Sequence, residues 1–378
     1  MNKNFIYALS TLVGTIIGVG LFSLPYTASK AGFWVILFYF IILGAVVILV
    51  NLLYGEVTLR TQGLHRLPGY AQKYLGLRGK KAAFLSNSLG LYGALLAYLI
   101  VGGQFLFSLL GPIFGGSNLI YTLVFFSLGA LLVYFGIKSI AQTEFFLLIL
   151  FFAVLFFIFY RGFSFIQIEN LFVFDKSEFF LPYGPVLFSL AGMALVPEVK
   201  EMLKDNPKQL KKLIPLAIFI PALIYLFFVI LILGLTGQNT SIEAISGLKD
   251  FFNDGIVNLA LFFGVLTTFT SFITLGLTLK KVFWYDLKVK KNLAWLLACF
   301  VPLALFFSGL KSFIAVISLT GGVMLGLDAI IIILIYLKAK TKGDLIPAYN
   351  ISLPRFLTYS LILFFVLGII YEIVYFIK

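Results

Sequence analysis

Apolar runs of roughly 20 residues recur along the whole chain, separated by short polar breaks. A helix needs about 20 apolar residues to cross the ~30 Å hydrocarbon core of a bilayer. Membrane barrels are excluded because their strands alternate apolar and polar residues, whereas these runs are apolar on all faces. The sequence therefore predicts an all-α polytopic membrane protein with about eleven transmembrane helices. The predicted spans are residues 5–28, 33–54, 82–111, 119–137, 142–160, 180–198, 213–235, 255–280, 293–308, 312–337 and 353–377.

Composition agrees with a single transmembrane domain over residues 1–378, because 61% of the chain is hydrophobic and only 11% is charged. A soluble domain would be about a quarter charged. The first run lacks a small-residue cleavage site, so we expect a retained helix and not a signal peptide. His65 is the only histidine and Cys299 the only cysteine. We therefore predict no metal cluster, no disulfide and no enzymatic activity.

The net charge of +13 is distributed unevenly between alternate connections. Cytoplasmic loops of membrane proteins carry an excess of Lys and Arg. This pattern predicts a multi-pass protein of the cell membrane with a cytoplasmic N-terminus and an external C-terminus. It argues against nucleic-acid binding, because the charge does not collect on one domain. With that orientation, the external Lys and Arg residues are only Lys30, Arg161, Lys176, Lys249, Lys311 and Lys378.

The first span is interrupted by Gly14, Gly18, Gly20 and Pro25. Irregular backbone at bilayer depth is tolerated only where it is buried in protein or lines a cavity. In transporters, such broken helices form the substrate site near the middle of the membrane. The sequence therefore predicts a ligand site at this break.

The sixth span repeats the pattern, since Gly192 precedes Pro197 by the same five residues that separate Gly20 from Pro25. Five spans separate the two starts, so the two helices cross in opposite directions. This is the arrangement of an inverted repeat of five plus five helices. The predicted repeats cover about 5–160 and 180–337, and the helix at 353–377 lies outside them.

Four stretches carry a family resemblance: GTIIGVGLFSLPY, YGEVTLRTQGLHRLPGYAQKYLG, YGALLAYLIVGGQFL and LFSLAGMALVPEV. They resemble amino acid permeases of the amino acid/polyamine/organocation superfamily. The likeness is greatest to the amino acid/auxin permease branch, which includes the hydroxy and aromatic amino acid permeases. The resemblance implies the LeuT-like fold, with substrate held between broken helices 1 and 6 and flanked by helices 3 and 8.

The helix-1 break supplies a natural carboxylate site, because amides at a helix N-terminus are unbonded and carry about +0.5 charge. Carbonyls at the opposing helix-6 break could accept from the substrate ammonium. Alternatively, the glycines only permit tight helix packing. The predicted contacts to the amino acid backbone are Gly18, Val19, Gly20, Leu21, Ser189, Ala191 and Gly192.

We predict Tyr98, Phe188, Met193 and Phe269 as walls around the substrate side chain. Asp328 is the only acid well inside a predicted span. No other intramembrane charge is available to pair a charged substrate, which favours a neutral, possibly aromatic amino acid. Asp328 is either a proton relay or a hydrogen-bonding partner of a neighbouring helix.

Thr267, Thr270 and Ser271 share one face of the eighth span by their three-and-four spacing. The resemblance to sodium-coupled relatives implies a Na⁺ site between these oxygens and the carbonyls of Gly14 and Ile17. The alternative is that each hydroxyl bonds to the carbonyl one turn earlier. The coupling ion, Na⁺ or H⁺, therefore stays open, and no other cofactor is expected.

Together these features predict a secondary active transporter that imports a neutral, possibly aromatic, L-amino acid by ion-coupled alternating access. The alternatives are an exchanger, a carrier of another small organic solute, or a non-transporting membrane sensor. The expected partners are the amino acid and the lipid bilayer, and the oligomeric state stays open. We also expect Glu56 and Glu198 to form inner-gate or structural ion pairs.

Overall fold

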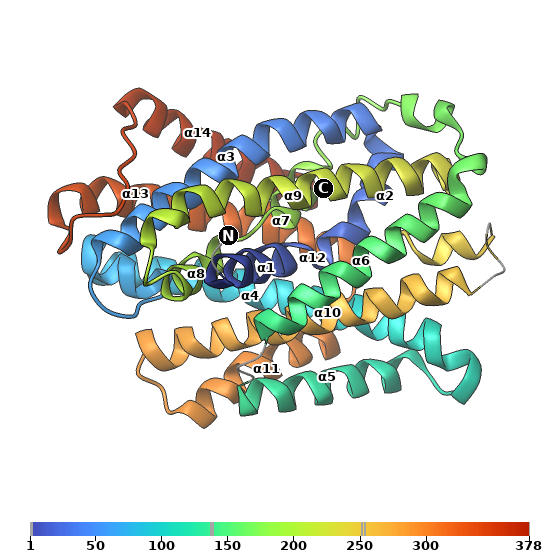
Figure 1. Cartoon of the computed structure of the whole chain (residues 1–378), viewed down its shortest axis with the longest axis horizontal. Helices are drawn as coiled ribbons and strands as arrows, with labels where there is room; N and C mark the ends of the chain where they lie inside the picture. Colours follow the sequence, from blue (N-terminus) through green and yellow to red (C-terminus); the bar gives the residue numbers. More distant parts are fainter. Residues whose placement is uncertain (1–2, 137–139, 251, 253–254, 378) are drawn as a thin grey trace.

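The computed structural model describes residues 3–136, 140–250, 252 and 255–377. All the regular elements in these residues are helical (Figure 1). Figure 1 shows α1, α7 and α12 at the centre, α5 and α11 along one edge, and α14 along the opposite edge. The α-helices are α1 (Lys3–Ile16), α2 (Gly20–Ala31), α3 (Phe33–Arg60), α4 (Leu67–Phe114), α5 (Asn118–Phe135), α6 (Ile140–Gly162), α7 (Tyr183–Ser189), α8 (Val196–Met202), α9 (Leu210–Thr236), α10 (Ile256–Lys281), α11 (Lys291–Phe307), α12 (Phe313–Leu319), α13 (Gly326–Lys342) and α14 (Arg355–Ile377).

Each predicted span corresponds to a helix or to a pair of helices. Within the described residues, seven helices are long and apolar enough to cross a membrane, and eight if the bent pair α1 and α2 is one span. The other three predicted spans correspond to α6, α11 and the interrupted pair α7 and α8. The tenth predicted span, residues 312–337, also changes geometry along its length, because a π-helical turn, η8 (Thr320–Leu325), separates α12 from α13.

The helix that contains the third span is longer than the predicted span, because α4 already begins at Leu67. The predicted spans 33–54 and 82–111 leave the basic segment before residue 82 as a loop. Leu67, Tyr70 and Tyr74 are buried along one face of the first turns, and Gly76 bends the helix with φ 75°. Their spacing is that of an amphipathic helix. This part of α4 therefore covers the end of the bundle before the membrane-spanning part begins.

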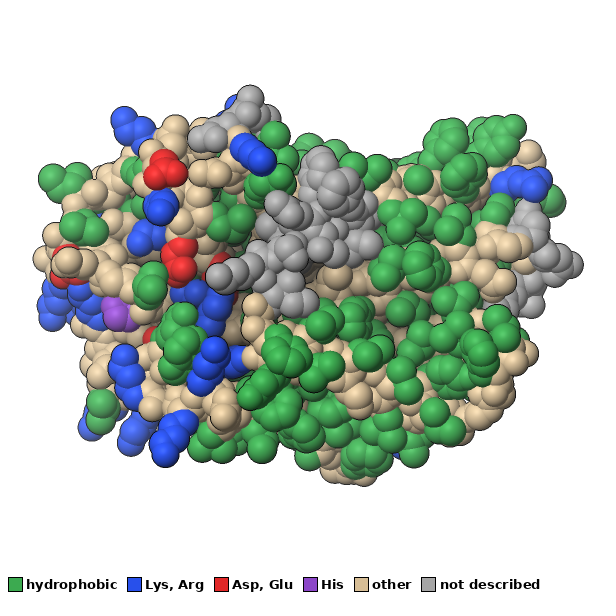
Figure 2. All heavy atoms as spheres, turned by 60° about the horizontal axis from the view of Figure 1, so that its bottom comes forward, with side chains coloured by type: hydrophobic (Ala, Val, Ile, Leu, Met, Phe, Trp, Pro, Cys, Tyr) green, Lys and Arg blue, Asp and Glu red, His purple; other side chains and the backbone are tan. Residues whose placement is uncertain are grey.

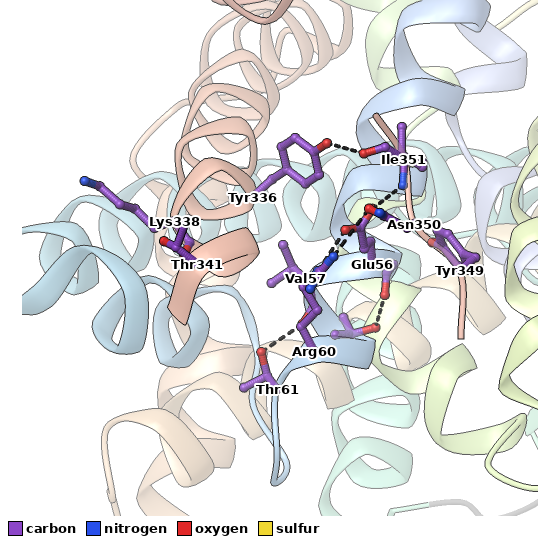
Figure 3. Close-up of polar contacts among 12 residues, drawn as sticks. Glu56, Val57, Arg60, Thr61, Tyr336, Lys338, Thr341, Tyr349, Asn350 and Ile351 are labelled. Atoms are coloured by element: carbon purple, nitrogen blue, oxygen red, sulfur yellow. Dashed lines mark hydrogen bonds and ion pairs between the residues drawn. The ribbon is translucent and has the colours of Figure 1, made fainter. Parts of the chain in front are cut away.

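The segment between α13 and α14 is tied to α3 by buried polar groups (Figure 3). The Glu56 carboxylate accepts from Arg60 Nε at 2.8 Å and from the Ile351 amide at 2.6 Å. The Tyr349 hydroxyl donates to the Leu52 carbonyl at 2.7 Å. Glu56 therefore makes the predicted ion pair, and it also fixes the entry into α14.

The surface divides into a charged end and an apolar belt. On the face seen in Figure 2, Lys and Arg side chains gather at one end, and hydrophobic side chains cover most of the remainder. Large apolar side chains such as Ile41, Phe135 and Phe356 are exposed. Such a belt would be unstable in water and fits a lipid environment.

Candidate functional site

The first span breaks where the sequence predicts. α1 and α2 meet at 46° across residues 17–19. The Leu21 amide, predicted as a ligand donor, instead donates to the Gly18 carbonyl at 3.2 Å. The amides of Val19 and Gly20 make no such backbone bond in the part of the chain that the structure describes. Two of the three predicted donors therefore stay available.

The sixth span breaks between Ser189, the last residue of α7, and Val196, the first of α8. The Tyr225 hydroxyl of α9 lies 3.2 Å from the Ser189 carbonyl and is also hydrogen-bonded to the Ile16 carbonyl. One buried phenol thus connects the two breaks. Sequence reasoning missed Tyr225, because nothing in its apolar span marks the side on which it lies.

Glycine lets the two breaks approach closely. A Cβ atom on Gly20 would lie 2.5 Å from Ser189 Oγ and 2.8 Å from Ser189 Cα. A Cβ atom on Gly18 would lie 2.5 Å from the Tyr98 hydroxyl oxygen. Real Cβ atoms essentially never come this close. Position 20 therefore requires glycine, because its Cβ would meet the Ser189 backbone, whereas a Cβ at position 18 would displace the Tyr98 side chain. These glycines therefore permit tight packing around the two breaks, and Gly20 also lines a cavity.

A cavity of about 50 Å³ lies between the two breaks, bounded by α4, α10, η8 and α13. Of the predicted residues, Gly20, Tyr98, Phe188, Ala191, Met193 and Asp328 line it. The other lining residues are Thr15, Ile16, Asn87, Gly90, Leu91, Ala94, Ala194, Leu275, Thr320 and Leu325.

The other predicted substrate contacts lie around this cavity without lining it. Gly192 packs against Leu12 and Ile16, and Val19 and Leu21 are fully buried. Gly18 and Ser189 form the glycine contacts described above.

Phe269 was predicted as a wall of the substrate site, but it does not line the cavity. Its ring packs instead against Phe125 of α5, with ring centroids 5.4 Å apart. Thr267 and Leu275 face α1 and the cavity. Phe269 is two residues from Thr267, about 200° around a helix with 3.6 residues per turn, so it faces the other way.

Asn87 is the most informative residue that the sequence analysis missed. Its Nδ2 donates to one Asp328 carboxylate oxygen at 3.0 Å, and Ser86 Oγ donates to the other at 2.5 Å. Asp328 thus bonds a neighbouring helix, as one of the two predicted alternatives states. Among the described residues, Asp328 forms no ion pair. The run Ser86–Asn87–Ser88 inside an apolar span was the available signal.

The predicted cation ligands come together only in part. Thr267 Oγ1 donates to the Ile17 carbonyl at 2.7 Å, which joins α10 to the helix-1 break. Ser271 Oγ is buried and has no hydrogen-bond partner. Thr270 Oγ1 bonds back to the Thr267 carbonyl at 3.2 Å, as the alternative reading predicts. Gly14 lies one turn before the break in α1.

Toward the charged end, a narrow gap continues from Asp328 and Asn87 to Arg66. Arg66 is only 2% exposed, and its guanidinium lies 2.9 Å from Glu201 and 3.4 Å from Glu198. Lys281 of α10 also pairs with Glu198, at 3.0 Å. Glu198 therefore makes the predicted ion pairs, in a network that closes this end of the cavity.

Toward the opposite end, the surface opens into a vestibule of about 840 Å³. Its lining includes Lys30, Glu178, Glu243, Lys311 and Tyr375. These charged side chains form no ion pairs with one another in the described part of the chain. The cavity between the breaks is therefore flanked by an open vestibule on one side and a buried ion network on the other.

Comparison with known proteins agrees with this architecture. The model of the tryptophan/tyrosine permease family matches residues 1–372. The chain is 26% identical over 297 residues to tyrosine-specific transport system 1 of Haemophilus influenzae, an alignment covering 74% of this chain and 72% of that protein. It is 35% identical over 106 residues to tyrosine-specific transport system 2 of the same organism, covering 28% of this chain and 26% of that protein.

Among solved structures, the crystal structure of MhsT in complex with L-phenylalanine superposes with a TM-score of 0.64 at 18% identity. The superposition covers 99% of this chain and 98% of that one. This match confirms the predicted LeuT-like fold with broken helices 1 and 6, while the exact bounds of the two repeats stay a prediction. The chain belongs to the tryptophan/tyrosine permease family and is a membrane-embedded amino acid transporter, not an enzyme.

Proposed function

We propose that this protein imports a neutral aromatic L-amino acid, with tyrosine as the first candidate, together with a proton that binds Asp328. The observation that carries this proposal is the cavity between the two breaks, which has backbone groups on one side and the Asn87–Asp328 pair on another. The names of the two relatives, both tyrosine-specific transport systems, support the choice of tyrosine.

The two breaks hold the amino acid backbone. The amides of Val19 and Gly20 begin α2, and a helix N-terminus favours a bound carboxylate through its dipole and its unbonded N–H groups. The absence of a Cβ at Gly20 lets the substrate approach the main chain. Carbonyls of the helix-6 break around Ala191 accept from the ammonium group.

The remaining walls select the side chain. Leu91, Ala94, Phe188 and Leu275 present apolar surface, which suits an aromatic ring. The polar end at Asn87 and Asp328 is placed to hydrogen-bond a ring hydroxyl or an indole N–H. A site built around such a bond discriminates against an analogue that lacks the polar group, because its own polar atoms are then left unpaired.

Asp328 is proposed as the proton carrier because of its burial and its neutral partners. It is 2% exposed, and both of its hydrogen bonds come from uncharged donors. An ionised carboxylate at the centre of a membrane helix costs about 2.5–3.5 kcal/mol on insertion scales. A proton taken up from outside removes that cost while the cavity is closed, and it leaves when the inner end admits water.

One observation favours Na⁺ as a second candidate for the coupling ion. Ser271 Oγ is buried without a partner beside the Thr267–Ile17 contact. Hydroxyl and carbonyl oxygens are suitable ligands for a hard cation. Sodium would have to replace the hydrogen bond between Thr267 and Ile17.

In this proposal, helices 1, 2, 6 and 7 (α1–α3 and α7–α9) rock against the rest of the bundle. The basic end that carries the Arg66 network faces the cytoplasm, and the vestibule faces outside. The N-terminus is then cytoplasmic and the C-terminus external, in the cell membrane.

The test is uptake of labelled tyrosine into proteoliposomes under an imposed proton gradient, a Na⁺ gradient, or neither. We expect accumulation only with the proton gradient. We expect Asp328→Asn to abolish accumulation while tyrosine exchange between the two sides continues. Accumulation driven only by Na⁺ would establish the second candidate if Ser271→Ala removes it and Thr268→Ala does not, because the Thr268 hydroxyl already donates to the Gly264 carbonyl at 2.7 Å. Folded protein that accumulates tyrosine under neither gradient would contradict the proposal and favour an exchanger, a carrier of another solute or a sensor.

A further inference from the structure

α14, which lies outside the predicted repeats, carries a buried acid on its protein-facing side. Thr358, Leu361, Phe365 and Glu372 are all buried and follow one face of the helix. The neighbouring Ile373 is 42% exposed, so the other face of α14 is open to lipid. The Glu372 side chain, 2% exposed, therefore points into the bundle.

Glu372 is wedged between two irregular elements. The Glu372 carboxyl group lies directly against Gly184, near the start of α7. A Cβ atom on Gly184 would lie 2.5 Å from a Glu372 carboxyl oxygen, and one on Gly322 would lie 2.8 Å from the same oxygen. Gly184 belongs to the outer half of broken helix 6, and Gly322 belongs to the π-helical turn η8. Glycine at both positions makes room for the carboxyl group.

In the part of the chain that the structure describes, no Lys, Arg or His forms an ion pair with this carboxyl group. The titratable groups around it are Tyr39 of α3, Tyr183 of α7, and Tyr371 and Tyr375 of α14. The segment before α7 adds Glu178, which accepts from the Tyr375 hydroxyl at 3.4 Å. Of the other elements packed on α14, α12 and η8 contain no titratable residue. In α13, Asp328 bonds α4, Tyr336 bonds the Ile351 carbonyl, and the lysines lie in the last turns of the helix. Within the described residues, Glu372 forms no ion pair, so burial there favours its neutral, protonated form.

The outer vestibule provides a route for the proton. Tyr375 is three residues beyond Glu372 on α14 and lines the vestibule. Leu181, three residues before Gly184, lines it as well. A small outward movement of α7 would therefore bring vestibule water to the Glu372 carboxyl group.

The same helix connects Glu372 to the substrate cavity. Gly184 and Phe188 lie one turn apart on α7, and both contact Gly321 of η8. A Cβ atom on Gly321 would lie 2.9 Å from Phe188 Cβ. Phe188 is a wall of the cavity. The position of α7 therefore sets both the enclosure of the substrate and the hydration of Glu372.

We propose that Glu372 is an external proton-binding site that controls the outer half of helix 6. With α7 packed inward, the carboxyl group is dry and holds its proton. When α7 moves outward, water hydrates the carboxylate and the proton returns to the vestibule from which it came. Because the linkage is reciprocal, external acid favours the closed position of α7. Glu372 is thus a positioning residue, and its proton is separate from any proton carried across the membrane at Asp328.

The test measures vestibule opening without transport, so it does not depend on the coupling ion. A fluorophore is attached at Ala315→Cys, in the vestibule lining, in a Cys299→Ala protein held in lipid nanodiscs. Collisional quenching by iodide reports how open the vestibule is to water. For one proton, the ratio of open to closed protein rises by up to about tenfold per pH unit over the titration range. We expect quenching to increase with pH accordingly, and Glu372→Gln to remove that dependence.

The matched control is Glu243→Gln, which removes another vestibule carboxylate that is not on α14. It should keep the pH dependence of the parent. If Glu372→Gln keeps the dependence, or Glu243→Gln loses it, the assignment to Glu372 is wrong. If Glu372→Gln does not fold, quenching of the parent that is independent of pH still contradicts the proposal. Glu372→Asp, which keeps a titratable group, should shift the pH dependence of quenching instead of removing it.

Discussion

At the charged end of the cavity, which is the inner end in the proposed orientation, the buried guanidinium of Arg66 holds Glu198 and Glu201 of α8. At the opposite end, the outer end in the same orientation, Gly20 and Ser189 bring the two breaks so close that a single added carbon atom would overlap the opposite break. One end is therefore closed by complementary charges and the other by the absence of side-chain volume. We therefore expect inner closure to respond to the loss of a charge and outer closure to respond to the gain of a methyl group.

The largest effect is expected at Gly20. In Gly20→Ala, the added Cβ would meet Ser189 Oγ at 2.5 Å and the Ser189 backbone at 2.8 Å, and the backbone cannot rotate away. The two breaks must then separate. Misplacement of a site by about 1 Å can cost on the order of 100-fold, so we expect a loss of tyrosine uptake of that size.

Initial uptake rates in proteoliposomes measure this loss. The control is Gly44→Ala in α3, where an added Cβ meets no atom within 4 Å. It should transport like the parent. Wild-type uptake by Gly20→Ala would show that the outer end does not depend on this contact.

A smaller effect is expected from Arg66→Met, which keeps the length of the side chain and removes its charge. Breaking a buried ion pair by removing one partner costs about 3–5 kcal/mol. Only part of that cost applies here, because Glu201 is 35% exposed and Glu198 keeps Lys281. Opening of the inner end relieves the remainder by hydrating Glu201, so we expect at least a ~10-fold shift toward the inward-open state.

Alkylation of Ala194→Cys in a Cys299→Ala protein follows this shift, because Ala194 lies between the cavity and the gap that leads to Arg66. Arg60→Met is the matched control. It removes an arginine that pairs with Glu56 at the same end of the molecule, away from the gap. Equal alkylation rates in parent and Arg66→Met would mean that charge does not close the inner end.

The sequence was sufficient for the fold because its signals are local. The length of each apolar run and the interruption at Gly18 and Gly20 can be recognised in the sequence without knowing which residues contact them in the fold. The helix that starts at Leu67 was missed because its signal is not local. Its basic residues suggested a loop, and the buried face that makes it a helix is apparent only where it packs on the bundle.

The site was predictable where a residue lies in a broken helix or carries unusual chemistry. Gly20 and Phe188 lie in the broken helices, and Asp328 is a buried acid within a span. All three line the cavity. Phe269 and Leu275 show the limit, since α10 is apolar on most faces and its pattern does not reveal its rotation. The structure turns Leu275 toward the cavity and Phe269 toward Phe125.

The smallest effect is expected from Lys311→Met at the outer end. The Lys311 ammonium lies 5.1 Å from the centre of the Phe306 ring in the open vestibule and is exposed to solvent. Exposed cation–π contacts contribute about 0.5–1 kcal/mol, and methionine keeps most of the apolar contact. If packing and not charge closes this end, tyrosine uptake should change by less than about fivefold, which is what 1 kcal/mol represents. Uptake rates at low and high salt measure it, and a loss as large as that of Gly20→Ala would place electrostatic closure at both ends and remove the contrast between them.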